Sequence, residues 1–325
     1  MGPSSSTTAG RQAGGTLASE RGDGAVARPR WYSHGWNRVA YYRAATALAA
    51  SLPRSARLGL ARAAGRRLGG RFPAERAAVR ANLRRVLPEA TPARLDAAVG
   101  ETFAAFAACF ADLLTLNRRH AGTLRRWVSS ATGEDHLEAA LAADRGVILL
   151  TAHLGNWELG GRLLGPRLGR ATHVVLSAEQ DAALETYLRT DTPGLHFVTR
   201  RHATSTLGLL AALRRREAVA LQGDRPTGER GDTLVPFFGE PAAFPLGPFV
   251  LARAAGAPVV PAFCTMDAEA RYRISIEPAI WVRRGEEAEA LARMVGALER
   301  AVRAAPTQWF NFFDVWPPGP PGVER

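Results

Sequence analysis

The segment Gly146–Gly161 reads GVILLTAHLGNWELGG and is the part of the chain that decides the fold. Its apolar run Val147–Leu150 ends in small residues, and His153, a Gly-Asn pair and an amphipathic segment follow directly. This pattern predicts a strand that feeds a helix, with the histidine at the junction. Because α/β folds bind ligands at the carboxyl ends of their strands, we expect a functional site at this junction.

His153 has the side chain of a general base, since imidazole titrates near neutral pH and a carboxylate can fix its tautomer. Glu158 follows it in the same segment. In a regular helix this spacing places the two side chains about 140° apart. If His153 instead lies in the turn before the helix, the conformational freedom of Gly155 lets the two side chains meet. A purely structural histidine in a turn is the alternative that the spacing leaves open.

Strands and helices alternate after Arg126, as in α/β proteins, and we expect a mixed central sheet flanked by helices. The expected strands are Val147–Leu150, His173–Ser177, Leu195–Thr199, Ala218–Gln222, Leu234–Phe238, Ala257–Met266 and Tyr272–Pro278. The expected helices are Asp135–Ala143, Asp181–Arg189, Thr204–Arg216, Pro248–Ala255 and Glu286–Ala304. Pro258 and Pro261 predict that Ala257–Met266 is an edge strand or an irregular segment, because proline cannot donate to a sheet.

The first part of the chain is expected to form a tail and a helical extension. Residues 1–30 hold almost no large apolar residue, which indicates a disordered tail without the apolar region of a signal peptide. The helical extension is expected at residues 31–128, and in its first part, residues 31–70, arginines interrupt the apolar helical pattern too often for a bilayer-spanning helix. Such a segment suits the headgroup plane of an anionic membrane, and helices packed on the main domain are the alternative. We place the α/β core at residues 129–318 and a C-terminal tail at residues 319–325.

Several side chains are expected in the interior. Phe103, Phe106 and Phe110 recur on one face of a helix, which is more typical of core than of a cofactor site. Cys109 and Cys264 lie far apart in the sequence and are expected to be buried free thiols. The aromatic segment 308–316 is expected to cover either an apolar channel for a chain-like ligand or an ordinary core.

The amino-acid composition indicates which binding partners the protein favours. The chain has 325 residues and a formal net charge of +12, and all 42 of its basic residues are arginine. This charge favours anionic partners, whether nucleic acid, an acidic lipid surface or a phosphorylated substrate. The histidines and cysteines show no metal-ligand spacing, so we expect no metal.

A second candidate position follows the expected strand Ala218–Gln222, where Asp224 and Arg225 come directly after the strand. The guanidinium of Arg225 offers donors in a fixed geometry that suits phosphate or carboxylate, whereas an Asp-Arg ion pair closing a turn is the alternative. Glu240, in a loop, is a second candidate partner for His153 if that loop folds over the site. Secondary candidates for binding anions are Arg200, Arg201 and Arg230.

Four blocks in order resemble a known family. They are HLGNWE at 153–158, GDRP at 223–226, LVPFFGEPAAFPLGP at 234–248 and GAPVVPAF at 256–263. The chain is similar to the bacterial lipid A biosynthesis (late) acyltransferases and to the phosphatidylinositol mannoside acyltransferases, within the glycerophospholipid acyltransferase superfamily. The resemblance covers about residues 30–318.

The resemblance implies acyl transfer from a thioester, either acyl-ACP or acyl-CoA, which is a co-substrate rather than a cofactor. His153 is then the general base on a hydroxyl of a glycolipid or phospholipid acceptor, and Glu158 or Glu240 orients it. The resemblance also implies an enzyme on the cytoplasmic face of the cell inner membrane, peripheral or monotopic, whose partners are an acyl carrier protein or coenzyme A, an anionic membrane surface and a lipid acceptor. It implies no nucleic acid.

Further residues acquire expected roles from the same resemblance. Gly155 and Asn156 begin the expected helix, and backbone N–H groups around Gly155 are the candidate oxyanion hole. Arg225 is expected to hold a phosphate of the donor or the lipid. Asp224, Arg230, Gly155 and Asn156 are grouped with it as candidate residues that bind substrate or phosphate.

Two other classes of function stay open at this point. A hydrolase would use His153 and Glu158 to activate water, although the chain has no G-x-S-x-G or metal motif. A basic protein that binds nucleic acid or another anionic surface without catalysis is compatible with the charge, but the arginines are spread over the whole chain and no recognition motif appears.

Overall fold

The computed structural model describes residues 39–116, 121–176, 194–199, 203–228 and 231–316. The helices are α1 (Val39–Ser51), α2 (Arg54–Gly69), α3 (Pro73–Val86), α4 (Pro92–Leu116), α5 (Ala121–Arg126), α6 (Glu134–Ala142), α7 (Trp157–Leu164), α9 (Ala203–Arg214), α10 (Gly247–Ala255) and α11 (Glu287–Ala304), with short 3₁₀ turns η1 (Gly165–Leu168) and η2 (Pro306–Gln308). The strands are β1 (Val128–Thr132), β2 (Val147–Thr151), β3 (Thr172–Leu176), β4 (Leu195–Thr199), β5 (Ala218–Gln222), β6 (Asp232–Phe237), β7 (Glu240–Pro245), β8 (Val259–Met266) and β9 (Tyr272–Ile276).

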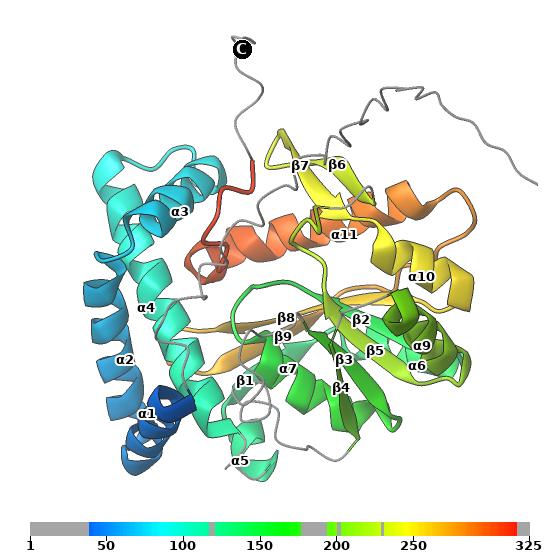
Figure 1. The fold of residues 1–325 in the computed structure, drawn as a ribbon, viewed down its shortest axis with the longest axis horizontal. Coiled ribbons are helices and arrows are strands. Elements are labelled where there is room, and N and C mark those ends of the chain that lie inside the picture. The colour runs from blue at the N-terminus through cyan, green and yellow to red at the C-terminus, as the bar shows by residue number, and fades with distance from the viewer. Residues whose placement is uncertain (1–38, 117–120, 177–193, 200–202, 229–230, 317–325) are drawn as a thin grey trace, which may run out of the picture. The chain divides into compact units, whose positions relative to one another are not determined.

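Seven of the described strands form one mixed sheet, which confirms the expected fold class. Their order is β1-β9-β8-β2-β5-β3-β4, and β6 and β7 form a separate antiparallel hairpin. Neighbouring strands from β8 to β4 pair in parallel, while β9 runs antiparallel to β8. The carboxyl ends of β2 and β5, which are direct neighbours, therefore lie at the same edge of the sheet (Figure 1).

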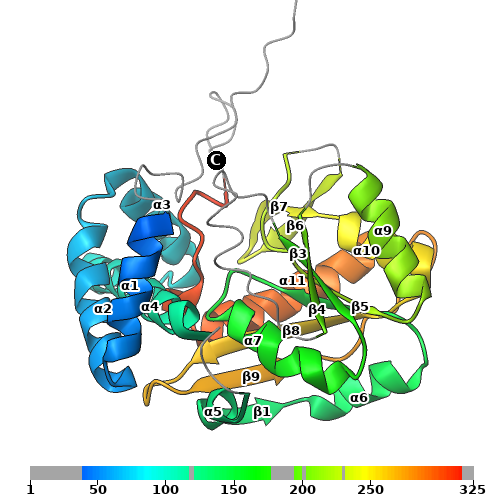
Figure 2. The same ribbon diagram turned by 60° about the horizontal axis from the view of Figure 1, so that its bottom comes forward.

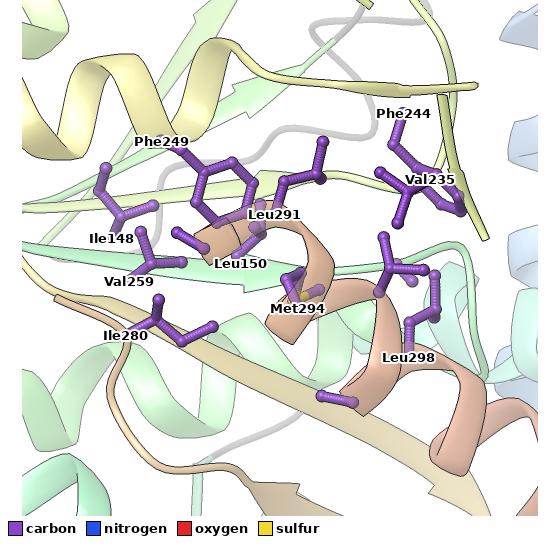
Figure 3. Packing of buried hydrophobic residues seen from close by; sticks show 14 of the residues in the cluster. Ile148, Leu150, Val235, Phe244, Phe249, Val259, Ile280, Leu291, Met294 and Leu298 are labelled. Atoms are coloured by element: carbon purple, nitrogen blue, oxygen red, sulfur yellow. The ribbon is translucent and has the colours of Figure 1, made fainter. Parts of the chain in front are cut away.

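The two faces of the sheet are covered by different helices because side chains alternate along a strand. On one face, Ile148 and Leu150 of β2 belong to a hydrophobic cluster with α10 and α11; Figure 3 shows them near Phe249 and Leu291. On the other face, Val147 and Leu149 belong to a second cluster with residues of α2, α3, α4, α6 and α7. Each face of β2 is thus buried, as the uninterrupted apolar run of this strand requires.

The N-terminal helices pack around α4 beside the sheet (Figures 1 and 2). A Cβ on Gly65 of α2 would lie 2.4 Å from the carbonyl oxygen of Phe103, so α2 and α4 approach closely only because that position is glycine. Phe103 is buried, and Phe106 is partly buried and packs edge-on against Phe310 and Phe312, which confirms the expected interior position of these two side chains. Phe110 is only partly buried. These helices share a hydrophobic cluster with the sheet, and the division of the chain at residue 128 stays a prediction.

One helix of the described part of the chain, Pro92–Thr115, is long and apolar enough to cross a membrane by length and composition alone. Half of its most apolar window is buried inside the protein, as in the core helices of proteins that never enter a membrane. Its composition is therefore weak evidence for insertion into a bilayer.

The expectation that Ala257–Met266 is an edge strand or irregular is wrong. The strand β8 lies inside the sheet, between β2 and β9. The ladder with β9 begins at Ala262, one residue after Pro261, and the carbonyl of Pro261 accepts a hydrogen bond from the backbone of Glu277. A proline is tolerated there because its missing N–H falls beyond the antiparallel ladder.

Both cysteines lie in the protein interior. Cys109 and Cys264 are free and buried, as expected, and burial raises the pKa of Cys109 to about 12. The expected helix Asp181–Arg189 and the tail of residues 1–30 lie outside the described residues.

Candidate active site

His153 is held in a tight turn between β2 and α7. The backbone N–H of Phe310 donates to the carbonyl of His153 (2.7 Å), and Leu154 forms an isolated antiparallel bridge with Trp309. Gly155 has a φ of +61°, and a Cβ there would lie 2.1 Å from the carbonyl oxygen of Cys264. Only glycine fits this position, both for its backbone angle and for its closeness to β8.

The carboxylate that partners His153 is Asp224. The last pair of the β2–β5 ladder joins Thr151 to Gln222, and each strand then continues by two residues to His153 and Asp224. Nδ1 of His153 lies 2.7 Å from Oδ1 of Asp224, whose side chain is fully buried. Because Nδ1 is bound to this carboxylate, Nε2 is the ring nitrogen that can accept a proton from another molecule.

Two residues near the C-terminus hold the second oxygen of Asp224. The indole Nε1 of Trp309 donates to Oδ2 at 3.3 Å, and Nδ2 of Asn311 donates to the same oxygen at 3.1 Å. Asn82 of α3 in turn donates to the carbonyls of Asn311 and Phe313, which fixes this part of the chain. A buried carboxylate with all these donors is fixed in position and remains ionised.

The electrostatics of the pair suit a neutral imidazole beside an ionised carboxylate. Burial lowers the pKa of His153, and the nearby Arg225 guanidinium lowers it further, against the opposing effect of Asp224. Burial alone would raise the pKa of Asp224, but the attraction and hydrogen bond of His153, together with Arg225, lower that pKa to about 2. At neutral pH the imidazole is therefore free to accept a proton, and the carboxylate stabilises the imidazolium that results.

The expected partners of His153 were wrong, because both Glu158 and Glu240 lie elsewhere. Glu158 lies in the first turn of α7, where it lines an apolar cavity and acts electrostatically on Arg162. Glu240 begins β7 and accepts a hydrogen bond from Nε of Arg85 at 3.0 Å. Asp224, expected to bind substrate, instead occupies the position of the orienting carboxylate.

The expected oxyanion hole is also corrected. The backbone N–H of Gly155 donates to the carbonyl of Gln308 and that of Asn156 donates to the carbonyl of Cys264, each at 2.8 Å. Neither N–H group is available to a substrate oxygen. Asn156 caps α7, since its Oδ1 accepts from the backbone N–H of Leu159 at 3.1 Å.

Arg225, which was expected to bind a phosphate, forms hydrogen bonds with other residues of the protein. Its Nε donates to Oδ1 of Asn311 at 2.8 Å, and one terminal nitrogen donates to the carbonyl of Phe310 at 2.8 Å. It thus braces the segment that holds Asp224, and its role toward phosphate stays a prediction. The secondary candidates Arg200, Arg201 and Arg230 lie outside the described residues.

Sequence reasoning missed Trp309 and Asn311, which it expected only as part of a roof or a lid. The signal that pointed to a special role is Asn311 itself, a polar residue inside the aromatic run WFNFF. It is fully buried, and a buried amide requires hydrogen-bond partners.

An apolar cavity lies between α7 and the sheet. It leaves about 70 Å³ of room for the centres of water-sized spheres and is open to solvent at one side. Trp157 lines the cavity and also contacts His153, with ring centroids 5.0 Å apart. Its walls include Leu149, Leu164, Val174, Leu195, Phe197, Ala220, Phe263 and Ile274. A hydrocarbon chain fits such a lining better than a polar substrate does.

The described residues contain no cluster of three or more His, Cys, Asp or Glu side chains suited to a metal ion. What the geometry offers is a positioned base, a buried carboxylate behind it and an apolar cavity beside it. These parts suit the deprotonation of a hydroxyl or of water next to a bound apolar group.

Comparisons with known proteins agree with this geometry. The family model for bacterial lipid A biosynthesis acyltransferases matches residues 32–317. A phosphatidylinositol mannoside acyltransferase of Mycobacterium tuberculosis (strain CDC 1551 / Oshkosh) is 29% identical over 245 residues, which are 73% of this chain and 76% of that protein. A lipid A biosynthesis palmitoleoyltransferase of Escherichia coli (strain K12) is 28% identical over 188 residues, which are 57% of this chain and 60% of that protein.

Proposed function

Because the chain belongs to the bacterial lipid A biosynthesis acyltransferase family, we propose that it moves a fatty acyl group from an acyl thioester to a hydroxyl of a glycolipid or phospholipid, with His153 as the base. The single observation that supports this chemistry is the buried His153–Asp224 pair at the carboxyl ends of two adjacent parallel strands. Acyl transfer to a lipid acceptor is the common content of the relatives' names.

The reaction follows from the geometry of the pair. Nε2 of His153 takes the proton of the acceptor hydroxyl while its oxygen attacks the thioester carbonyl carbon. The tetrahedral intermediate then expels the thiolate, which takes the proton from the imidazolium, so a C–O ester bond replaces the C–S bond. Asp224 keeps the proton on Nδ1 and stabilises the imidazolium. General-base assistance of this kind contributes about 100-fold to 10,000-fold.

The cavity beside α7 is the proposed site of the acyl chain. Trp157 forms part of its wall and touches His153, and we propose that the carboxyl end of the acyl chain lies at this wall, beside the imidazole. The donor is acyl-ACP or acyl-CoA, and both carriers are anionic, which suits a protein of net charge +12. The thioester is a co-substrate, and we propose that no other cofactor takes part.

The surface proposed to face the membrane is the outer side of α1 and α2. Leu48, Leu60 and Leu68 are about half exposed there. Residues 39–74 contain no Asp or Glu, and the arginines in this range are Arg43, Arg54, Arg57, Arg62, Arg66, Arg67 and Arg71. Arg54 and Arg57 pair with Asp112, and Arg62 and Arg66 pair with Glu101. The exposed leucines together with Arg43, Arg67 and Arg71 fit a helix pair lying on an anionic bilayer. We place the enzyme on the cytoplasmic face of the inner membrane, where acyl thioesters are made.

An in vitro assay tests the proposed reaction. The purified full chain is incubated with palmitoyl-CoA or palmitoyl-ACP and with vesicles of total host lipid, and products are identified by mass spectrometry. The wild type and the control His136→Ala are expected to form one acylated lipid, and His153→Ala is expected to form at least about 100-fold less. His136 lies on α6, where Nδ1 contacts the carbonyl of Ile276.

Two results would contradict the proposal. Free fatty acid in place of acylated lipid would identify a hydrolase that uses the same pair. Equal acylation by His153→Ala would show that the histidine has a structural role only.

A further inference from the structure

A buried hydrogen-bond chain leads from the helical extension to the turn that carries His153. The hydroxyl of Tyr272 on β9 donates to Oδ2 of Asp112 on α4 at 2.9 Å. The same hydroxyl accepts a hydrogen bond from Nδ2 of Asn156 at 3.0 Å. Asp112 and Tyr272 are fully buried and Asn156 nearly so. Three elements that are distant in sequence thus meet at one tyrosine hydroxyl.

Asp112, at the far end of this hydrogen-bond chain, is held by two arginines. Arg57 donates to Oδ1 of Asp112 and Arg54 donates to Oδ2, each at 2.7 Å. Arg54 also stacks over Trp127, with its guanidinium carbon 4.4 Å from the ring centroid. A carboxylate buried between two guanidinium groups keeps its orientation, because moving it would leave unpaired charges in the interior.

The near end of the hydrogen-bond chain reaches the first turn of α7, next to His153. Asn156 comes directly before α7 and caps that helix through its Oδ1. Its amide nitrogen donates to the Tyr272 hydroxyl at 3.0 Å and to the carbonyl of Cys109 at the longer distance of 3.3 Å. The next residue, Trp157, places its ring edge-on against the imidazole of His153. A shift of Asn156 therefore moves the first turn of α7 and, with it, the ring that confines His153.

We propose that Tyr272 is a positioning residue for His153, which it acts on through its hydrogen bonds to Asp112 and Asn156. This inference rests on the proposed function, because it assigns the network a role in acyl transfer. The hydroxyl does not touch the reacting atoms; it holds the turn in which the base is presented. Small displacements of a base cost much activity, since the proton transfer requires hydrogen-bond distance.

The direct test is Tyr272→Phe, which removes only the hydroxyl. The matched control is Ile276→Val, a conservative change of a buried residue on the same strand. Melting temperature, kcat and KM for the acyl donor are measured for both variants. Tyr272→Phe is expected to lower kcat about 10-fold or more with KM little changed, whereas Ile276→Val keeps the wild-type kcat. A wild-type kcat in Tyr272→Phe, with only the melting temperature lowered, would overturn the inference.

A second variant keeps the test decisive if Tyr272→Phe folds poorly. In Asn156→Ser, the serine hydroxyl can still cap α7, but the amide group that donates to the Tyr272 hydroxyl is lost. Its kcat is expected to fall as in Tyr272→Phe. The kcat of the double variant is expected to equal that of the less active single variant, because both substitutions break the same series of hydrogen bonds. A wild-type kcat in Asn156→Ser, or losses that multiply, would contradict the inference.

Failure of the inference is distinguishable from failure of the proposed function. If the wild type forms no acylated lipid, or His153→Ala forms as much as the wild type, the proposed function fails. If the wild type is active and depends on His153 while Tyr272→Phe keeps full kcat, only the role of Tyr272 fails.

Discussion

The reactivity of His153 depends on one carboxylate that approaches it from another strand. Oδ1 of Asp224 binds Nδ1 of the imidazole, and Trp309 and Asn311 hold the other oxygen. The ring is thereby fixed in the tautomer whose Nε2 accepts a proton. The charge of Asp224, rather than its size, is what stabilises the imidazolium.

Asp224→Asn tests this distinction, since it keeps the volume and removes the charge. We expect kcat to fall at least about 100-fold, because an amide neither stabilises the imidazolium nor secures the correct tautomer. The control is Asp144→Asn, which changes a largely exposed aspartate paired with Arg216. The measurement is kcat for acyl transfer in both variants. Wild-type activity in Asp224→Asn would contradict the assigned role.

The pH dependence follows from the pKa of His153. Burial and Arg225 lower this pKa from its ordinary value of 6.5, and only the neutral imidazole accepts a proton. Activity should therefore be full at neutral pH and fall only as the pH drops through a value below 6.5. A profile of kcat/KM against pH measures the midpoint of this acidic limb. A midpoint above 6.5 would mean that the charge of Asp224 outweighs burial.

At the scale of elements, α7 and the strands beneath it form the walls of the apolar cavity. Ala220 of β5 lines the cavity with a methyl group only. Ala220→Leu would add three carbon atoms to the lining, so we expect the preferred acyl donor to become shorter by a few carbons. Competition between acyl-CoA chains of different length measures this preference. Ala211→Leu makes the same change at an exposed position of α9 and should leave the preference unchanged. An unaltered preference for acyl-chain length in Ala220→Leu would show that the acyl chain binds outside this cavity.

The elements that sequence patterns predict well are those with strong apolar periodicity. The strand β2, the turn at His153 and α7 follow the pattern of Gly146–Gly161 closely. The strands β1 and β7 were missed for physical reasons. β1 is half exposed and holds the polar run VSSAT, and β7 contains prolines that a two-stranded hairpin tolerates. Neither strand has the apolar signal of a buried segment.

The position of Asp224 could not be derived from local patterns because it depends on strand order. The motif at 223–226 was visible, but nothing in the sequence shows that β5 lies directly beside β2. A carboxylate five residues from His153 was the nearest candidate, whereas the actual partner comes from the neighbouring strand. Asn311, from the end of the chain, depends on the same long-range packing.

At the scale of the whole molecule, the exposed arginines at the end of α2, Arg67 and Arg71, predict binding to anionic vesicles. The double variant Arg67→Glu, Arg71→Glu should bind vesicles containing phosphatidylglycerol at least about 10-fold more weakly, since each arginine near such a surface contributes about 1 kcal/mol. Arg283→Glu, Arg284→Glu reverses two exposed arginines outside this surface and is the matched control. Vesicle flotation measures both. Equal loss in the two variants would indicate a general effect of net charge.

The most direct test of the central claim is mass spectrometry of total lipids from the native host, with wild-type protein compared with His153→Ala at equal protein level. The His153–Asp224 pair predicts that one class of lipid loses a single acyl chain in the variant, and the mass of that class identifies the acceptor. An unchanged lipid profile would contradict the claim that His153 is the base of a lipid acyltransferase.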